Sequence, residues 1–284
     1  MMKKSLISTA FLAAFSGFVQ AETTKLPSVN VYSAYAAPVN QDQTASSVTV
    51  LTEKDFAQRN ATYVSDVLKT VPGVAMGVSG GRGAATSLFL RGANSKHTAV
   101  IIDGIRVNPA DTNFDFGGLS LSNIEQIEVL RGEQSALWGS DAMGGVVYIT
   151  TKSGLYKDKP FNVDFDFGTG SHRTRDGSVT ISGQQNGFYY ALHGDSHRTS
   201  GISARSKNVF NYTSLSGATS TNIPASEKDG FHRDNASIRL GFDDSKKGFD
   251  FLASHSSQTL HFDNSAVDEL KFDDNTRVRE TRYK

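Results

Sequence analysis

The sequence predicts a mixed α/β domain followed by the first strands of an antiparallel transmembrane β-barrel. Short helix and strand patterns alternate between residues 48 and 152, and from residue 155 onward apolar and polar residues alternate with period two. After residue 21 no apolar run reaches the length of a spanning helix, which is about 20 residues. Any membrane residence of the mature chain must therefore come from strands.

Composition excludes several classes of function. The 284 residues include 29 basic and 29 acidic side chains, and this balance argues against a nucleic-acid partner, which requires a basic excess. Cysteine is absent, so the chain has no disulfide, thiolate metal site or cysteine nucleophile. The hydrophobic content of 38% fits a soluble protein and a barrel equally well, because only every second strand residue of a barrel faces lipid.

The N-terminus has the pattern of a cleaved signal peptide over residues 1–21. Two lysines precede an uncharged apolar stretch, 6–19, and the small residue Ala21 ends the segment. The stretch is short for a membrane anchor, which is the alternative interpretation. We expect an exported chain whose mature part begins near Glu22.

A polar, flexible leader is predicted over residues 22–47. One segment in it, 28–34, alternates, with its two valines on one face and Asn30 and Tyr32 on the other. Such a segment can add to the edge of a partner's sheet by strand augmentation. The pattern alone favours the simpler alternative, a local strand.

The region 48–152 is predicted to fold from short helices and strands. Thr52 is a helix N-cap, with acidic residues in the first turn, and Pro72-Gly73 ends a second helix. Helices are expected after Thr52 and at 64–71, and strands at 48–51, 88–90, 97–102, 124–130 and 146–150.

The region 155–284 is predicted to contain five or six strands of a barrel. Phe161, Val163, Phe165 and Phe167 alternate with polar residues, and further stretches alternate near 178–182, 188–192, 238–242 and 249–251. Short turns and a long polar loop, 197–231, separate them, as in outer-membrane barrels. A soluble antiparallel sandwich is the alternative.

Five segments occur in a fixed order in the α/β region. They are DVLKTVPGV (66–74), LFLRG (88–92), VIIDGIR (100–106), IEQIEVLRG (124–132) and SALWGSDAMGGVV (135–147). These segments resemble the plug-domain motifs of TonB-dependent receptors, and the last two are the most specific. The resemblance covers residues 28–152 and continues into the strands.

The resemblance implies a plug domain, 48–152, inside an outer-membrane barrel of roughly 22 strands. It implies active transport of a large ligand with energy from TonB, by a protein that is no enzyme and is a monomer when complete. Within the family, residues 138–142 and 228–231 make the chain look most like the vitamin B12 (cobalamin) receptors. A siderophore or haem receptor, or an exported adhesin without transport, are the alternatives.

By similarity to cobalamin receptors, five loop residues match ligand-contacting positions: Ala85, Ser87, Asn94, Thr112 and Asn113. Their loops are glycine-rich and polar, so a large ligand can approach the backbone closely. The Asn94 amide can donate and accept hydrogen bonds. The alternative is that all five are solvated loop residues.

The resemblance also implies a Ton box, the strand that pairs with TonB. It falls on Ser28, Val29, Asn30, Val31, Tyr32, Ser33 and Ala34. Asn30 and Tyr32 replace the usual aliphatic residues, but strand pairing uses main-chain bonds and tolerates such changes.

No cofactor is required, but calcium in extracellular barrel loops is a further implication of the cobalamin-receptor resemblance. The candidate ligands are Glu227, Asp229, Asp263 and Asp274. Calcium takes six to eight oxygen ligands, and Ser203 stands where another acidic ligand is expected. Solvated acidic loops are the alternative.

Two further expectations concern structure. Arg91 and Arg131 each precede a glycine, and an ion pair with Glu125 or Glu128 is expected over acid–base catalysis, because no nucleophile or histidine constellation accompanies them. Roughly 22 strands of about 10 residues need about 220 residues, whereas 130 follow residue 154. We therefore expect an incomplete barrel with an open sheet edge, which does not transport alone.

Overall fold

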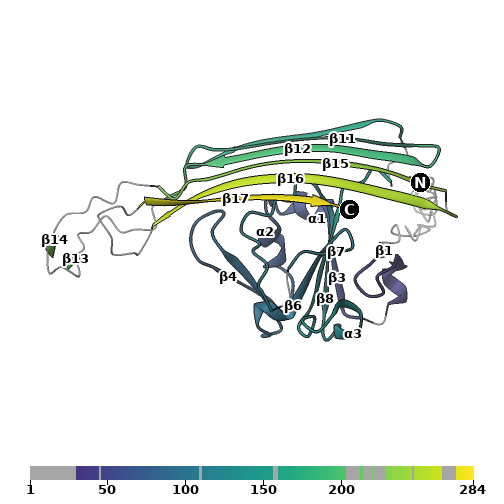
Figure 1. The fold of residues 1–284 in the computed structure, drawn as a ribbon, viewed down its shortest axis with the longest axis horizontal. Helices are drawn as coiled ribbons and strands as arrows, with labels where there is room; N and C mark the ends of the chain where they lie inside the picture. Colours follow the sequence, from purple (N-terminus) through teal and green to yellow (C-terminus); the bar gives the residue numbers. More distant parts are fainter. Residues whose placement is uncertain are drawn as a thin grey trace, which may run out of the picture.

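The fold consists of a long curved sheet with a small mixed domain packed beneath it (Figure 1). The computed structural model describes residues 30–44, 46–108, 111–155, 159–202, 212–213, 219–220, 228–244, 246–263 and 273–284. The predicted signal peptide lies outside these ranges. The large sheet and the small domain, residues 48–152, correspond to the predicted partial barrel and α/β region, so the predicted fold class is confirmed.

The small domain is built on a five-stranded mixed sheet. Its order is β3 (Val48–Thr52), β8 (Ile124–Arg131), β9 (Gly145–Thr151), β6 (Thr98–Ile102) and β7 (Ile105–Arg106). β6 and β9 are parallel and the other pairs antiparallel. Two hairpin-like pairs flank it: β4 (Val74–Val78) with β5 (Thr86–Leu90), and β1 (Asn30–Val31) with β2 (Val39–Asn40).

Short helices cover this sheet. They are α1 (Glu53–Gln58), α2 (Val64–Leu68), α3 (Ser135–Trp138) and the 3-10 turns η1 (Gln41–Gln43) and η2 (Ser95–His97). Thr52 starts α1 as expected, because its N–H and hydroxyl both donate to the Asp55 carboxylate at 2.9 Å. Within the described ranges, no helix is long and apolar enough to cross a membrane.

The two clusters of buried apolar residues lie in the small domain. Val64, Val67 and Leu68 of α2 are fully buried against strands β5, β6, β8 and β9, in a cluster that includes Ile127 and Leu90. A smaller cluster lies on the opposite face of the sheet around Leu130 and Tyr148. No residue of the large sheet belongs to either of these clusters of buried residues.

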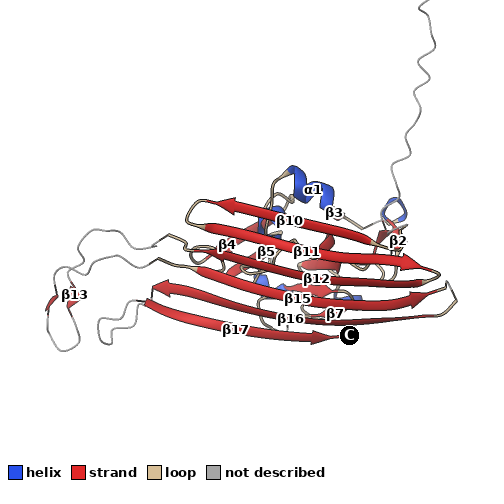
Figure 2. Ribbon diagram, turned by 90° about the horizontal axis from the view of Figure 1, so that it is seen from above, coloured by secondary structure: helices blue, strands red, loops and turns tan. Residues whose placement is uncertain are grey.

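The large sheet has six antiparallel strands side by side (Figure 2). In order they are β10 (Asn162–Gly170), β11 (Thr174–Gln185), β12 (Phe188–Thr199), β15 (Phe231–Asp243), β16 (Gly248–Asp263) and β17 (Asp273–Tyr283). A separate two-residue pair, β13 (Tyr212–Thr213) and β14 (Thr219–Ser220), lies within the loop between β12 and β15. The sheet is open at β10 and β17.

The faces of the large sheet follow the predicted alternation. Tyr189 lies on the inner face and is buried, whereas Phe188 and Leu192 of the same strand are exposed on the outer face. Phe165 and Phe167 of β10 are 82% and 74% exposed. An apolar outer face with a polar inner face is the pattern of a membrane barrel wall.

Two sequence-based expectations need correction. In the described part of the chain, the Arg131 guanidinium donates to the Pro72 carbonyl at 3.1 Å and to the Thr49 hydroxyl at 2.9 Å, rather than to Glu128. Glu128 instead accepts hydrogen bonds from the segment before the small domain. The predicted leader is also structured from Asn30 onward, because that carboxylate gives its backbone a partner.

Candidate functional site

The described part of the Ton-box-like segment, 30–34, is docked on the small domain. β1 pairs with β2, and both Val31 and Ser33 are fully buried. Ser28 and Val29 of the predicted segment lie outside the described residues. Because its side chains are buried and its backbone is bonded, the segment must leave this position before it can pair along its length with another strand.

A buried carboxylate, Glu128 of β8, holds the backbone of this segment. It accepts hydrogen bonds from the N–H of Tyr32 at 2.9 Å and of Ser33 at 2.8 Å. The Gln126 amide donates to the same carboxylate at 2.9 Å and to the Asn30 carbonyl at 3.0 Å. Burial raises the pKa of the Glu128 carboxyl above its usual range, and the hydrogen bonds that oppose this are the weaker influence.

Aromatic side chains complete this contact. The Tyr32 ring stacks on that of Tyr148, with centroids 5.7 Å apart and an interplanar angle of 11°. The Trp138 indole N–H donates to the Ser33 carbonyl at 2.7 Å, and its ring lies 5.9 Å from Tyr148. Trp138 is the chain's only tryptophan, so its fluorescence reports directly on whether the segment is docked. We call residues 30–34 with Glu128 and Trp138 the segment dock.

The five predicted ligand residues lie at the surface of the small domain. Ala85, Asn94, Thr112 and Asn113 are exposed and Ser87 is half-buried. Ala85 lies in the loop before β5 and Ser87 in β5 itself, Asn94 lies in the loop before η2, and Thr112 and Asn113 lie in the loop after β7. Their role in binding a ligand stays a prediction.

Hydrogen bonds tie these three loops together. The Asp115 carboxylate accepts the N–H of Thr86 at 2.8 Å, and Lys96 forms an ion pair with Asp111 at 2.7 Å. The Asn94 side-chain oxygen accepts the N–H of Lys96 at 3.2 Å, so that oxygen caps η2 and the amide N–H₂ is the group left for a ligand. The structure therefore brings together the loops that sequence similarity singled out.

A second ion pair fixes the loop after β7. The Arg106 guanidinium contacts the Asp141 carboxylate at 2.5 Å, and the same carboxylate accepts the N–H of Asp111 at 3.2 Å. The hydrogen bond from Arg106 holds the pKa of Asp141 below its usual value. Both residues belong to the motif segments that carry the resemblance. Their spacing in the sequence does not predict that they form an ion pair.

Three of the four predicted calcium ligands have side chains outside the described part of the structure. Glu227 lies outside the described residues, as do the side chains of Asp263 and Asp274. Asp229 is described and buried at the end of the long loop. In the described part of the chain, no three His, Asp or Glu side chains gather as a metal site requires. Calcium binding stays a prediction.

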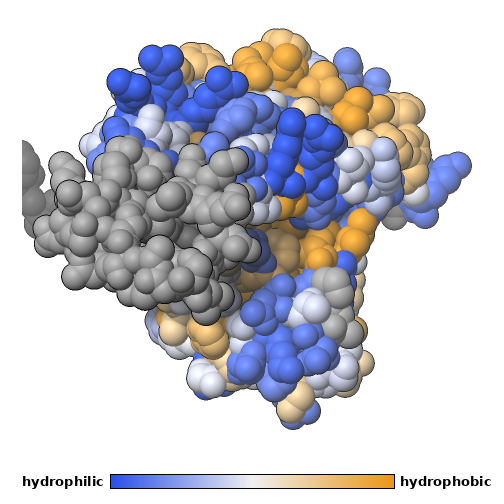
Figure 3. Space-filling model, turned by 60° about the vertical axis from the view of Figure 1, so that its left-hand side comes forward, coloured by the Kyte–Doolittle hydropathy of each residue, from blue (hydrophilic) through white to orange (hydrophobic). Residues whose placement is uncertain are grey.

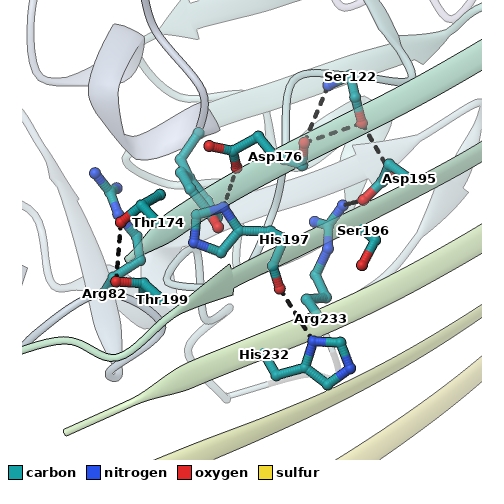
Figure 4. Close-up of polar contacts among 12 residues, drawn as sticks. Arg82, Ser122, Thr174, Asp176, Asp195, Ser196, His197, Thr199, His232 and Arg233 are labelled. Carbon is teal, nitrogen blue, oxygen red and sulfur yellow. Dashed lines mark hydrogen bonds and ion pairs between the residues drawn. The ribbon is translucent and has the colours of Figure 1, made fainter. Parts of the chain in front are cut away.

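Polar residues join the small domain to the large sheet (Figure 4). Asp195 of β12 pairs with Arg233 of β15, and it accepts the Ser122 hydroxyl of the small domain at 2.9 Å. Arg233 also donates to the Gly118 carbonyl at 2.6 Å. The Asp195 and Arg233 side chains are each 5% exposed, so this is a buried charged contact between the two parts of the chain.

Arg239 of β15 makes a second contact of this kind. Its guanidinium lies between Asp250 on the sheet, at 2.9 Å, and Asp103 of the small domain, at 3.2 Å. It also reaches the carbonyl and the hydroxyl of Thr151 at 3.3 Å. The period-two alternation predicts polar residues on one face of these strands, but a charged residue on such a strand does not reveal its partner.

A cavity of about 520 Å³ lies between the small domain and the outer ends of β11 and β12. Tyr63 and His197 line it, with the two rings edge to face at 5.2 Å, and the Arg82 guanidinium lies 4.3 Å from the Tyr63 ring. A side chain at Gly83 would collide with Phe231, so glycine is required for this close approach. None of the predicted ligand residues is among those that line this cavity.

Comparison with known proteins identifies a known domain in part of the chain. Residues 40–146 match the family described as the TonB-dependent receptor plug domain. Residues 40–146 therefore form a plug domain of the TonB-dependent receptor type. The vitamin B12 transporter BtuB of Vibrio vulnificus (strain YJ016) is 38% identical to it over 157 residues, which cover 53% of this chain and 25% of that protein.

Solved structures show the same fold for the plug domain with its adjoining wall. The siderophore receptor PiuA of Acinetobacter baumannii gives a TM-score of 0.61 at 20% identity, covering 83% of this chain and 29% of that one. The ferripyoverdine receptor of the Pseudomonas aeruginosa outer membrane gives 0.62 at 15% identity, covering 88% and 33%. The chain thus spans about a quarter to a third of these relatives.

The relatives bear out two further expectations about this chain. They are receptors and transporters, so the expectation of a family without enzymatic activity is confirmed at that level. The predicted location in the bacterial outer membrane is confirmed as well. The predicted ligand residues, metal ligands and domain boundaries stay predictions.

Proposed function

We propose that the chain forms the plug domain and part of the barrel wall of a receptor that imports a large ligand with energy from TonB. The segment dock is the observation that supports it most. Residues 30–34 are held by hydrogen bonds to one carboxylate and by aromatic contacts, rather than by continuous pairing in a large sheet. Such a segment can be released from the plug domain and can then pair as a strand with the edge of a partner's sheet.

A proline at Val31 tests this proposal. In the receptor that contains this chain, Val31→Pro removes a backbone donor and is expected to reduce TonB-dependent uptake to the level of a TonB-null strain, while ligand binding to whole cells stays unchanged. Val31→Ala, which keeps the N–H, is the matched control and should retain uptake. Normal uptake by the proline variant would refute the role of the segment.

Cobalamin is the first candidate ligand. The 38% identical relative is a vitamin B12 transporter, whereas the similar solved structures are siderophore receptors whose identities of 20% or less carry only the fold. The receptor gene is expected to restore growth of a receptor-null strain that depends on external cobalamin, and not growth of one that depends on a ferric siderophore. Growth in the second assay alone would favour the siderophore alternative.

A further inference from the structure

The segment dock holds residues 30–34 from two sides. On one side is Glu128, which lies on β8, an inner strand of the five-stranded sheet. On the other side is Trp138, whose indole N–H donates to the Ser33 carbonyl at 2.7 Å. Trp138 ends α3, a single helical turn of four residues of which none is buried. The hold of Trp138 on the segment therefore depends on what fixes this turn.

The turn that carries Trp138 is closed on itself. The Gln134 N–H donates to the Ala142 carbonyl at 2.8 Å, and the Trp138 N–H donates to the Gln134 carbonyl at 3.0 Å. We call residues 134–142 the Trp138 turn. Because these bonds join its two ends, the Trp138 turn can shift as one body, and a displacement of Asp141 then moves the indole as well.

Asp141 holds the Trp138 turn in place. The surface of the small domain carries many hydrophilic side chains (Figure 3), so a surface turn is held largely by polar contacts. The Asp141 side chain is 15% exposed, and its carboxylate contacts the Arg106 guanidinium at 2.5 Å and accepts the N–H of Asp111 at 3.2 Å. Arg106 also lies against Gly139 of the turn, where a Cβ atom would come within 3.3 Å of the guanidinium. One charged pair thus joins the Trp138 turn to the loop after β7.

The loop after β7 is itself anchored to the sheet. Asn108 is 2% exposed, and its side chain accepts the N–H of Val100 at 2.8 Å and donates to the Thr98 carbonyl at 3.2 Å, both on β6. The Arg106 guanidinium donates to the Asn108 carbonyl at 3.0 Å. The path from β6 to the Trp138 turn is therefore continuous, and Asp141 is its last link.

We propose that Asp141 is a positioning residue for the segment dock. It fastens the Trp138 turn to the loop after β7 and so keeps the indole on the Ser33 carbonyl. The restraint on the segment then comes from a loop that carries two of the predicted ligand positions, Thr112 and Asn113. This inference rests on the proposed function only in taking residues 30–34 as the segment that TonB binds.

Amide hydrogen exchange tests the proposal, because the N–H groups of Tyr32 and Ser33 exchange when the segment leaves Glu128. The 284-residue chain is refolded in nonionic detergent, and exchange is read for each peptide by mass spectrometry. Asp141→Asn removes the charge of the carboxylate and keeps its shape. We expect exchange of the two amides to become about five-fold faster, the lower end of the range for coupling between sites. Exchange in β8 and β9 should stay unchanged.

Two outcomes of this experiment would overturn the proposal. One is unchanged exchange of the segment in Asp141→Asn. The other is an equal acceleration in β8 and β9, because Asp141 would then support the whole fold and not the dock in particular.

Variants of the partner and a matched control complete the test. Arg106→Gln should give the same acceleration and add little to Asp141→Asn, as expected for two residues that act as one pair. Arg106→Lys keeps the charge and should retain most of the docking. Asp244→Asn is the control, because this carboxylate also accepts backbone N–H groups, from Lys246 and Lys247 in the turn after β15. An equal effect of Asp244→Asn on the segment would contradict the proposal, since loss of charge alone would explain it.

The soluble part of TonB gives a readout that separates this inference from the proposed function. A docked segment cannot pair with TonB, so the apparent affinity is reduced to the fraction of the segment that is free. Asp141→Asn should therefore raise the affinity of the chain for soluble TonB by about the same five-fold, measured by isothermal titration. Faster exchange at Tyr32 and Ser33 with unchanged affinity would uphold the role of Asp141 and refute the pairing of this segment with TonB.

Discussion

Arg239→Ala is expected to lower the free energy of unfolding by about 3–5 kcal/mol, which is the range for breaking one side of a buried ion pair. The substitution leaves the Asp103 side chain, 1% exposed, without the guanidinium that links it to the sheet. It also leaves Asp250 with one cation fewer. The loss should appear as an earlier midpoint in urea unfolding of the refolded chain in detergent, followed by Trp138 fluorescence.

Arg173→Ala is the matched control for this prediction. Arg173 is exposed in the turn between β10 and β11, and surface substitutions of this kind usually change stability by less than about 0.5 kcal/mol. If both arginine variants unfold at the same urea concentration, the contact between Arg239 and Asp103 does not hold the plug domain to the wall.

Glu128→Ala is expected to release the Ton-box-like segment. It removes the acceptor of the backbone N–H groups of Tyr32 and Ser33, and a buried donor left without a partner costs about 1–3 kcal/mol. Two such donors cost about 2–6 kcal/mol, enough to shift a docked segment to a mostly free one. The expected signal is a change in Trp138 fluorescence together with faster proteolysis near residue 30.

Two substitutions accompany this experiment. Glu133→Ala removes an exposed carboxylate five residues along the chain and should leave the Trp138 signal unchanged. Glu128→Gln keeps an acceptor oxygen and should keep the segment docked. Full retention of the Trp138 signal and of protease resistance in Glu128→Ala would contradict the role given to this carboxylate.

Docking is also expected to depend on pH, and the sign follows from the pKa. Burial raises the pKa of Glu128 in the docked state, so docking is strongest below the ordinary carboxyl range and weakens as the pH rises through the raised pKa. Burial likewise raises the pKa of Tyr148, the titratable ring beside it, which therefore stays neutral. A Trp138 signal that depends on pH in the native chain and not in Glu128→Gln would support this assignment.

Local sequence patterns were enough to predict most of the elements. The Thr52 cap, the stop at Pro72-Gly73 and the period-two alternation each depend on residues close in sequence, and each element is found near its predicted position. The strands of the large sheet are longer than predicted, with β16 extending from Gly248 to Asp263. Their outer ends carry polar residues on both faces, so the apolar alternation stops before the strand does.

The contacts that make up the site could not be predicted from the sequence. Glu128 meets Ser33 across 95 residues, and Arg239 meets Asp103 across 136. A carboxylate buried for such a contact looks the same in sequence as one exposed on a strand. The motif segments did place Arg106 and Asp141 in the right domain, but only the fold shows that they form a pair.

The separation of the apolar core from the large sheet has a mechanical consequence. Both clusters of buried apolar residues lie within the plug domain, whereas Asp195, Arg233 and Arg239 join it to the wall through polar contacts. Water can replace such contacts one at a time, but it cannot replace apolar packing without a large loss of free energy. A force applied to the chain near residue 30 would therefore break the polar contacts between plug and wall first, and water would enter that boundary. The plug itself would unfold only afterwards.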